Sequence, residues 1–270
     1  MLTLNNIKVK KFTFPDGQQH INLDGVIDWK NVTEFNIKCS IKDAKDLIDI
    51  LLVNEVIQKH NQYVIPVNLY IEYLYGARMD RRIGDFEPFT LKVVADILNT
   101  CRFSRIFTFN VHSDVSTNLL RSKNILPSRQ VDKAIALSKA DICVAPDKGS
   151  IKWVELMLDD NMFTSCEKKR DLSTGKLSGF TVLEPDRVKG KNCLIVDDIC
   201  DGGVTFAGIA AELRKAGAKS VSLYVSHGIF SKGYKIEGID KIYTTNSFKE
   251  KYPEEVVVFD AFAIGLEYIY

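Results

Sequence analysis

The sequence predicts an α/β protein of two doubly wound domains, each built on a mostly parallel sheet. Short apolar runs rich in β-branched residues alternate along the chain with segments that have the three-and-four spacing of amphipathic helices. This alternation is typical of βαβ units, which form parallel sheets. It lapses around residues 120–128 and then restarts, so we expect domains of residues 1–126 and 127–270. A chain of 270 residues with 46% hydrophobic content can form two cores.

The composition excludes several classes of protein. The 36 basic and 35 acidic side chains nearly cancel, which argues against a nucleic-acid partner. No uncharged apolar stretch approaches the roughly 20 residues of a membrane span, and residues 1–11 lack the apolar centre of a signal peptide. The six cysteines include no CxxC pair, which indicates neither a zinc site nor a disulfide framework. We therefore expect a cytoplasmic protein without a membrane partner, in which Cys200 is the thiol most open to reagents.

The first domain is expected to begin with a hairpin. Residues 7–15 alternate as a strand does, and Pro15-Asp16-Gly17 is a turn signal that leads into a second strand through residue 23. A strand at residues 36–40 and a helix at 44–60 follow.

An arginine cluster follows the next predicted strand, at residues 64–75. The heptapeptide Gly-Ala-Arg-Met-Asp-Arg-Arg, residues 76–82, places three arginines and Asp80 at the end of this apolar run. Unpaired charge is not buried, so these side chains face either solvent or a ligand. Arginine forks bind phosphate oxygens bidentately, which makes a polyphosphate the functional interpretation and a solvated turn the structural one.

A histidine follows the next predicted helix and strand. We expect a helix at residues 87–98 and a strand at 105–111, with His112 directly after it. A lone histidine is more often structural than catalytic, but the carboxyl end of a strand is where open α/β sheets bind ligands.

The second domain is expected to repeat the pattern. A helix at residues 131–138 leads to a strand at 141–145 that ends in Pro146-Asp147-Lys148-Gly149, before a helix from 151. A strand at 163–167 is followed by a basic, glycine-bearing segment, residues 168–176, which we expect to be a mobile loop. Further strands are predicted at residues 179–183, 220–226 and 256–259.

The most informative stretch is residues 192–205, Asn-Cys-Leu-Ile-Val-Asp-Asp-Ile-Cys-Asp-Gly-Gly-Val-Thr. An apolar strand is expected to end at Asp197 and Asp198, and a helix is expected to start near Phe206. A helix N-terminus after a glycine turn binds anions through its free N–H groups. Carboxylates accept hydrogen bonds from sugar hydroxyls and can hold Mg²⁺, so we predict a phosphorylated sugar here rather than an ordinary strand-to-helix connection.

This stretch resembles the phosphoribosyl pyrophosphate loop of the type I phosphoribosyltransferase fold. With residues 76–82, His112, residues 146–149 and residues 168–170 in that order, the chain resembles the ribose-phosphate pyrophosphokinase family from about Lys10 onward, with a shortened N-terminus. The resemblance implies transfer of the β,γ-diphosphoryl group of ATP to the C1 hydroxyl of ribose 5-phosphate, giving phosphoribosyl pyrophosphate and AMP with Mg²⁺.

The resemblance also implies a role for each matching residue. The catalytic residues would be Lys168, Arg170 and His112. The ATP-binding residues would be Phe14, Asp16, Arg78, Asp80 and His112, and the metal ligands His112 and Asp147. The ribose 5-phosphate site would comprise Asp197, Asp198, Asp201, Gly202, Gly203, Val204 and Thr205. In the family, the turn of Phe14 and Asp16 serves a neighbouring subunit, which implies a homo-oligomer, a dimer or larger, with a shared ATP site.

Two other functions stay open. A base phosphoribosyltransferase would share the acidic loop but consume phosphoribosyl pyrophosphate, and it would need neither a second domain nor residues 76–82. A non-catalytic regulatory homologue would be expected to lose Lys168, Arg170 or His112, and all three are present. The chain departs from the family at Met79, Gly202 and Val204, where glutamine, threonine and glycine are usual.

Overall fold

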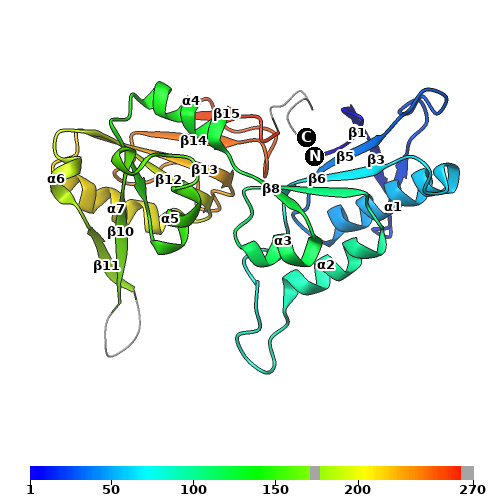
Figure 1. Cartoon of the computed structure of the whole chain (residues 1–270), viewed down its shortest axis with the longest axis horizontal. Coiled ribbons are helices and arrows are strands. Elements are labelled where there is room, and N and C mark those ends of the chain that lie inside the picture. The colour runs from blue at the N-terminus through cyan, green and yellow to red at the C-terminus, as the bar shows by residue number, and fades with distance from the viewer. Residues whose placement is uncertain (171–176, 263–270) are drawn as a thin grey trace. The chain divides into compact units, whose positions relative to one another are not determined.

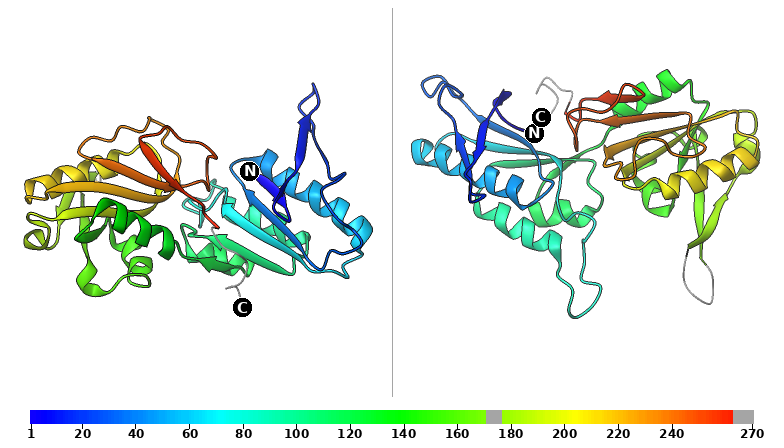
Figure 2. Two further views of the ribbon diagram at one scale, coloured as in Figure 1. Left: turned by 90° about the horizontal axis from the view of Figure 1, so that it is seen from above. Right: turned by 180° about the vertical axis from the view of Figure 1, so that it is seen from behind.

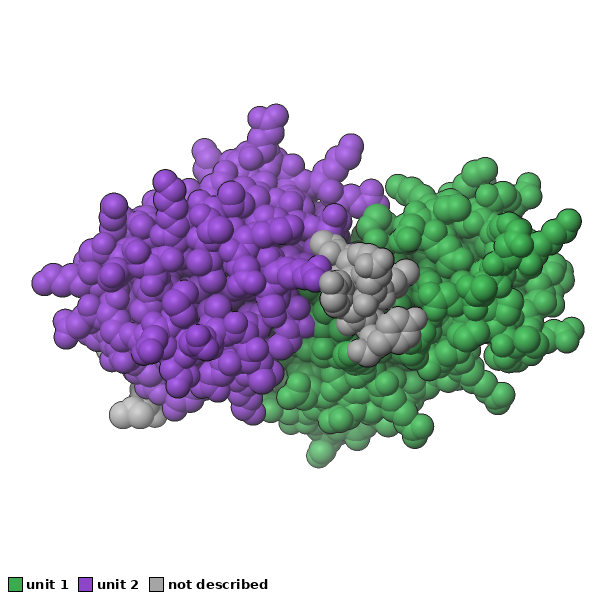
Figure 3. Space-filling model, turned by 45° about the horizontal axis from the view of Figure 1, so that its top comes forward, with its two compact units in different colours: residues 1–125 green, residues 126–270 purple. Residues whose placement is uncertain are grey.

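The computed structural model describes residues 1–170 and 177–262, drawn in Figure 1. The chain forms two compact units, Met1–Ile125 and Leu126–Tyr270, which Figure 3 shows in different colours. Each unit contains a mostly parallel sheet with helical crossovers. The predicted α/β fold class is confirmed.

The first unit is built on a six-stranded sheet with the order β2-β1-β5-β6-β7-β8. Its strands are β1 (Leu2–Leu4), β2 (Ile7–Lys8), β5 (Phe35–Ser40), β6 (Val67–Tyr73), β7 (Arg105–Phe109) and β8 (Lys123–Ile125). Its helices are α1 (Ala44–Asn61), α2 (Thr90–Thr100) and α3 (Asp114–Leu120). The strands from β5 to β8 are parallel and advance in one direction, so right-handed crossovers place the three helices on one face (Figure 1).

A separate hairpin, β3 (Lys10–Thr13) and β4 (Gln19–Asn22), precedes β5 and stands off the sheet in the left view of Figure 2. Its turn closes where the N–H of Phe14 donates to the carbonyl of Gln18 at 2.9 Å. The hairpin predicted from Pro15-Asp16-Gly17 is confirmed.

The second unit is built on a seven-stranded sheet with the order β11-β10-β9-β12-β13-β14-β15. Its strands are β9 (Ile142–Ala145), β10 (Phe163–Arg170), β11 (Leu177–Val182), β12 (Asn192–Cys200), β13 (Ser220–Gly228), β14 (Lys241–Thr245) and β15 (Val256–Phe259). Its helices are α4 (Ser128–Ser138), α5 (Lys148–Val154), the 3₁₀ helix η1 (Asp160–Met162), α6 (Pro185–Val188) and α7 (Val204–Lys215). All strands except β11 run parallel.

The winding of this second sheet reverses between two neighbouring strands, β9 and β12. From β9 the chain crosses through α5 to β10 on one side, and from β12 it crosses through α7 to β13 on the other. Accordingly, one face packs on Ile209 and Leu213 of α7, and the opposite face packs on Val131 and Val154 of α4 and α5. Such a reversal is a topological switch point, where open α/β sheets bind ligands.

Two predicted strand ends are wrong. The strand expected to stop at Val196 continues to Cys200 because β13 pairs with it through His227 and Gly228, so Asp197 and Asp198 lie inside β12. The loop expected from Lys168 begins later, because β10 continues to Arg170 in antiparallel pairing with β11. Residues 171–176 of that predicted loop lie outside the described residues.

Two short elements border or occupy the region where the sequence pattern lapses: α3 ends at its start, and β8 lies within it. A helix of seven residues and a strand of three are too short to establish a periodicity. In the described part of the chain, no helix has the length and apolar character needed to cross a membrane.

Candidate active site

The predicted sugar-phosphate residues gather at one edge of the second sheet. Because β9, β10 and β12 are parallel neighbours, their carboxyl ends lie along the same edge. Asp147 follows β9, and Lys168 is the third residue from the end of β10. Asp197 and Asp198 lie near the end of β12. The switch point thus brings three carboxylates and one ammonium group together.

Both carboxylate oxygens of Asp147 accept hydrogen bonds. Its Oδ1 caps helix α5 by accepting hydrogen bonds from the N–H groups of Gly149 at 2.9 Å and Ser150 at 3.2 Å. Its Oδ2 accepts from Nζ of Lys168 at 2.6 Å. Burial raises the pKa of Asp147, but the hydrogen bond and charge of Lys168 together with the backbone donors of Ser150 and Gly149 outweigh it, so the pKa lies below the usual 3.8. The carboxylate is therefore ionised and holds the lysine in place.

In the acidic pair of β12 the pKa of Asp197 is shifted in the opposite direction. Asp198 is buried and Asp197 is partly buried. Burial, followed by the charges of Asp198 and Asp147, raises the pKa of Asp197 well above 3.8. A group that donates hydrogen bonds or carries positive charge would relieve this repulsion, and sugar hydroxyls are such donors.

The loop after β12 presents backbone rather than side chains. Gly203 adopts φ = +79° and directly precedes α7, and no described side chain caps that helix. The first N–H groups of α7 are thereby left for an anion, which the helix dipole also favours. This is the geometry expected for residues 201–205, although Val204 is 65% exposed at the first helical position.

A second segment, residues 230–238, shapes this loop and was missed from the sequence. Oγ of Ser231 donates to Asp201 at 2.6 Å. A Cβ at Gly203 would lie 3.0 Å from Ile236, and one at Gly202 would lie 3.3 Å from the Lys232 side chain. Lys232 therefore lies beside the candidate phosphate loop. The pair Ser231-Lys232 before Gly233 is a weak signal that sequence analysis could have noted.

In the first unit, residues 76–82 follow β6 as predicted. Gly76 has φ = +83°, and a Cβ there would lie 3.2 Å from Thr90 at the start of α2. The N–H of Met79 donates to Gly76 at 2.9 Å. The loop backbone is thus fixed on α2, while the side chains of Arg78, Arg81 and Arg82 are exposed and Asp80 is partly buried.

The other predicted residues of this unit occupy two places. His112 follows β7, the parallel neighbour of β6, and directly precedes Ser113, which caps α3. Phe14 and Asp16 lie in the β3–β4 turn, where Oδ1 of Asp16 accepts from the N–H of Gln18 at 3.0 Å and the Phe14 side chain is 42% exposed.

The roles predicted for Arg170 and for the two metal ligands stay predictions. The side chain of Arg170 lies outside the described residues. Within the described ranges, no group of three or more histidine, cysteine, aspartate or glutamate side chains is arranged to hold a metal ion. The roles of His112 and Asp147 as metal ligands therefore stay predictions.

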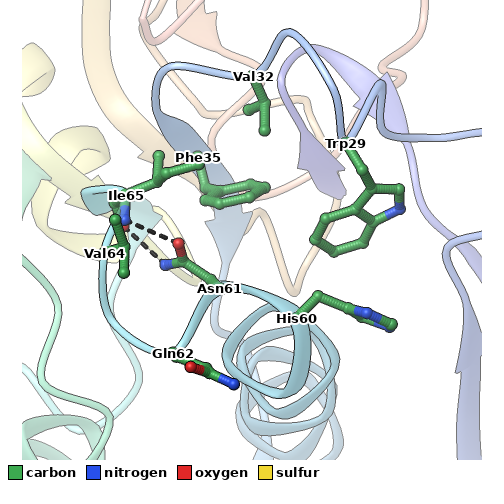
Figure 4. A pocket seen from close by; sticks show the side chains of 8 residues that line it. All are labelled: Trp29, Val32, Phe35, His60, Asn61, Gln62, Val64 and Ile65. Carbon is green, nitrogen blue, oxygen red and sulfur yellow. Dashed lines mark hydrogen bonds between the residues drawn. The ribbon is translucent and has the colours of Figure 1, made fainter.

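The first unit also contains a pocket of about 390 Å³ that none of the predicted residues line. Figure 4 shows the rings of Trp29 and Phe35 on one side and the amide of Asn61 hydrogen-bonded to the backbone of Ile65 on the other. It lies at the amino ends of β5 and β6, opposite the carboxyl ends that carry the predicted site.

The fold and the switch-point site define a protein of the phosphoribosyltransferase class, and the model of the phosphoribosyl transferase domain matches residues 138–261. The ribose-phosphate pyrophosphokinase of Mycoplasma pneumoniae is 30% identical over 258 residues, which cover 88% of this chain and 75% of that protein. The enzyme of the same name from Pyrococcus furiosus is 28% identical over 253 residues, covering 90% and 86%. The chain belongs to the ribose-phosphate pyrophosphokinase family.

A solved structure agrees on the fold. The phosphoribosylpyrophosphate synthetase of Mycobacterium smegmatis superimposes with a TM-score of 0.73 at 20% identity, over 94% of this chain and 86% of that one. The similarity extends over both units.

Proposed function

We propose that the protein transfers the β,γ-diphosphoryl group of ATP to the C1 hydroxyl of ribose 5-phosphate, yielding phosphoribosyl pyrophosphate and AMP. The observation that carries this proposal is the ion pair of Lys168 and Asp147, 2.6 Å long, at the edge where the acidic strand β12 leads into an uncapped helix N-terminus. Family membership supports the same reaction.

In this proposal the second unit binds ribose 5-phosphate. The backbone of residues 201–205, together with the Thr205 hydroxyl, binds the 5-phosphate, because free N–H groups at a helix start are donors for phosphate. Asp197 and Asp198 accept hydrogen bonds from the ribose hydroxyls, which relieves the repulsion that raises the pKa of Asp197.

The first unit binds ATP. The exposed guanidinium of Arg78 binds phosphate oxygens, and Asp80 in the same loop and His112 after the neighbouring strand complete this group. Phe14 and Asp16 contact the nucleotide from the β3–β4 turn, and serve a neighbouring subunit of a homo-oligomer.

Lys168 is the residue with the clearest chemical role. Diphosphoryl transfer depends on positioning and on neutralising charge in the transition state. The ammonium of Lys168, oriented by Asp147, stabilises the negative charge on the transferring group, and Arg170 two residues later adds a second cation.

The donor set fits Mg²⁺. This ion prefers oxygen ligands and is usually bound by one or two carboxylates with substrate phosphates completing the shell, rather than by an all-protein cage. The ionised carboxylate of Asp147 in the second unit would be such a donor, and His112 in the first unit would be a ligand of a separate Mg²⁺ at the ATP phosphates. When bound, Mg²⁺ neutralises charge on the phosphate oxygens of ATP. A cytoplasmic location stays a prediction from the sequence.

The proposal is tested by incubating the purified protein with ATP, Mg²⁺ and ribose 5-phosphate and separating the nucleotides. We expect AMP and phosphoribosyl pyrophosphate in equal amounts. Formation of ADP, or turnover only after a nucleobase is added to phosphoribosyl pyrophosphate, would contradict it. Omitting ribose 5-phosphate gives the control for hydrolysis of ATP.

A further inference from the structure

The β3–β4 hairpin has two chemically different faces. In its register Lys11 lies opposite Ile21, and Phe12 lies opposite His20. Because side chains alternate along a strand, these two pairs point to opposite faces. Ile21 is 5% exposed in the core of the first unit, whereas Phe12 is 45% exposed and its ring lies 4.9 Å from that of His20 and 5.2 Å from that of Phe14.

The inner face carries an ion pair between an exposed lysine and a buried carboxylate. Nζ of Lys11 lies 2.5 Å from Oδ2 of Asp49 and 3.7 Å from Asp46, both on helix α1. Asp49 is only 1% exposed, and its other oxygen, Oδ1, has no hydrogen-bond partner among the described residues. The burial of this carboxylate is therefore compensated mainly by Lys11.

Two contacts hold the hairpin against the first unit, the burial of Ile21 on β4 and the ion pair of Lys11 on β3. A two-stranded hairpin alone is marginally stable in water, and all four residues of β3 are exposed. A shift of β3 by one residue would point Phe12 at α1 and leave the buried carboxylate of Asp49 without its cation. Ile21 orients β4, and the ion pair orients β3, none of whose residues is buried, so that its aromatic face is directed outward.

We propose that Lys11 and Asp49 are positioning residues of the nucleotide site, because their ion pair fixes the hairpin that presents Phe14 and Asp16. The inference rests on the proposed function, in which this turn contacts ATP. Neither Lys11 nor Asp49 need touch the nucleotide; they act through the geometry of the hairpin.

Steady-state kinetics of Lys11→Met test the proposal. We expect the KM for ATP to rise about tenfold, while the KM for ribose 5-phosphate and the kcat at saturating ATP change by less than about twofold, since only nucleotide binding uses the hairpin. Lys10→Met is the matched control, because Lys10 is exposed on the opposite face of the same strand, and it should match wild type. Equal changes in both KM values would overturn the proposal.

Two double variants separate positioning from stability. Lys11→Asp with Asp49→Lys reverses the ion pair and should restore the KM for ATP to within about threefold of wild type. Lys11→Met with Asp49→Leu replaces the pair by apolar side chains, which restores stability in comparable sites without the directional contact. We expect a melting temperature near that of wild type but a KM for ATP that stays raised. A normal KM in this apolar variant would assign the pair a purely structural role and overturn the proposal.

Failure of the proposed function has a different signature. If wild-type protein forms no AMP, the proposed reaction is wrong. The effect of the ion pair on the hairpin is then measured by hydrogen exchange of residues 10–22. We expect faster exchange in Lys11→Met and in the apolar double variant than in wild type and Lys10→Met. Identical exchange in all four proteins would overturn it.

Discussion

Residues 76–82 and residues 201–205 both follow a parallel strand, yet they expose different chemical groups. The first loop fixes its backbone on α2 and exposes the side chains of three arginines. The second exposes backbone N–H groups, and its shape is enforced by a positive φ at Gly203 and by contact with residues 230–238. A site made of side chains loses one contact when one residue changes, whereas a site made of backbone loses its shape.

The ion pair of Lys168 and Asp147 combines a side-chain group with a fixed backbone. The ammonium of Lys168 is held by the carboxylate of Asp147, which is itself fixed because it caps α5. We expect Lys168→Ala to lower kcat by about a thousandfold or more with little change in either KM, since the ammonium acts mainly in the transition state. Lys148→Ala is the matched control, because it removes an exposed lysine that pairs with Glu167 at 2.9 Å nearby. A variant that lost only substrate affinity would contradict the catalytic role.

Gly203→Val tests the backbone site. A side chain there would adopt an unfavourable φ of +79° and meet Ile236 at 3.0 Å, so we expect the KM for ribose 5-phosphate to rise about a hundredfold, with a stability loss of about 1–3 kcal/mol. Gly202→Ala should change the KM by less than about threefold, because its new Cβ meets only the flexible Lys232 side chain. Similar effects of both variants would mean that φ does not define this site.

Arg78→Ala tests the side-chain site. Loss of one charge-assisted contact of about 1.5 kcal/mol should raise the KM for ATP about tenfold, without affecting ribose 5-phosphate or the melting temperature. The control is Arg82→Ala, an exposed arginine of the same loop. If both variants lose the same affinity, the loop binds ATP through its overall charge and not through Arg78.

Asp197→Asn tests the cost of the acidic pair. Because the folded pKa of Asp197 is raised, the folded protein binds its proton more tightly than the unfolded chain does, and stability falls as pH rises from 3.8 toward the folded pKa. The neutral asparagine should thus stabilise the protein at pH 7, a gain that disappears below pH 3.8. Urea unfolding at both pH values measures this, and destabilisation at pH 7 would contradict it.

The double replacement of Asp197 and Asp198 by asparagine should in addition weaken ribose 5-phosphate binding. Wild-type affinity in that variant, measured by titration calorimetry, would refute their assignment to the sugar hydroxyls.

The smallest effect concerns the thiols, which contribute to neither site. All six cysteines are buried, and burial with the charges of Asp197 and Asp201 raises the pKa of Cys200 to about 12. We therefore expect native protein at pH 8 to react with a thiol reagent far more slowly than unfolded protein. The sequence-based expectation that Cys200 is accessible is wrong, because this residue is the buried end of β12.

The elements that sequence analysis located best carry strong local signals. The β3–β4 hairpin has its turn residues, and α1 has apolar residues at helical spacing along its 18 residues. The extent of β12 could not be predicted, since Asp197 and Asp198 resemble a strand end until β13 pairs beside them. The same holds for the contact of Lys168 with Asp147 and for the packing of Ile236 on Gly203, because both join residues more than twenty positions apart.

Asp147 combines two tasks that differ in their need for a charge. The same carboxylate caps α5 and orients Lys168, but only the second task needs a charge. Asparagine caps helices about as well as aspartate does. Asparagine at position 147 would therefore keep the cap of α5 while Lys168 lost its ionic partner, so one substitution separates the two tasks.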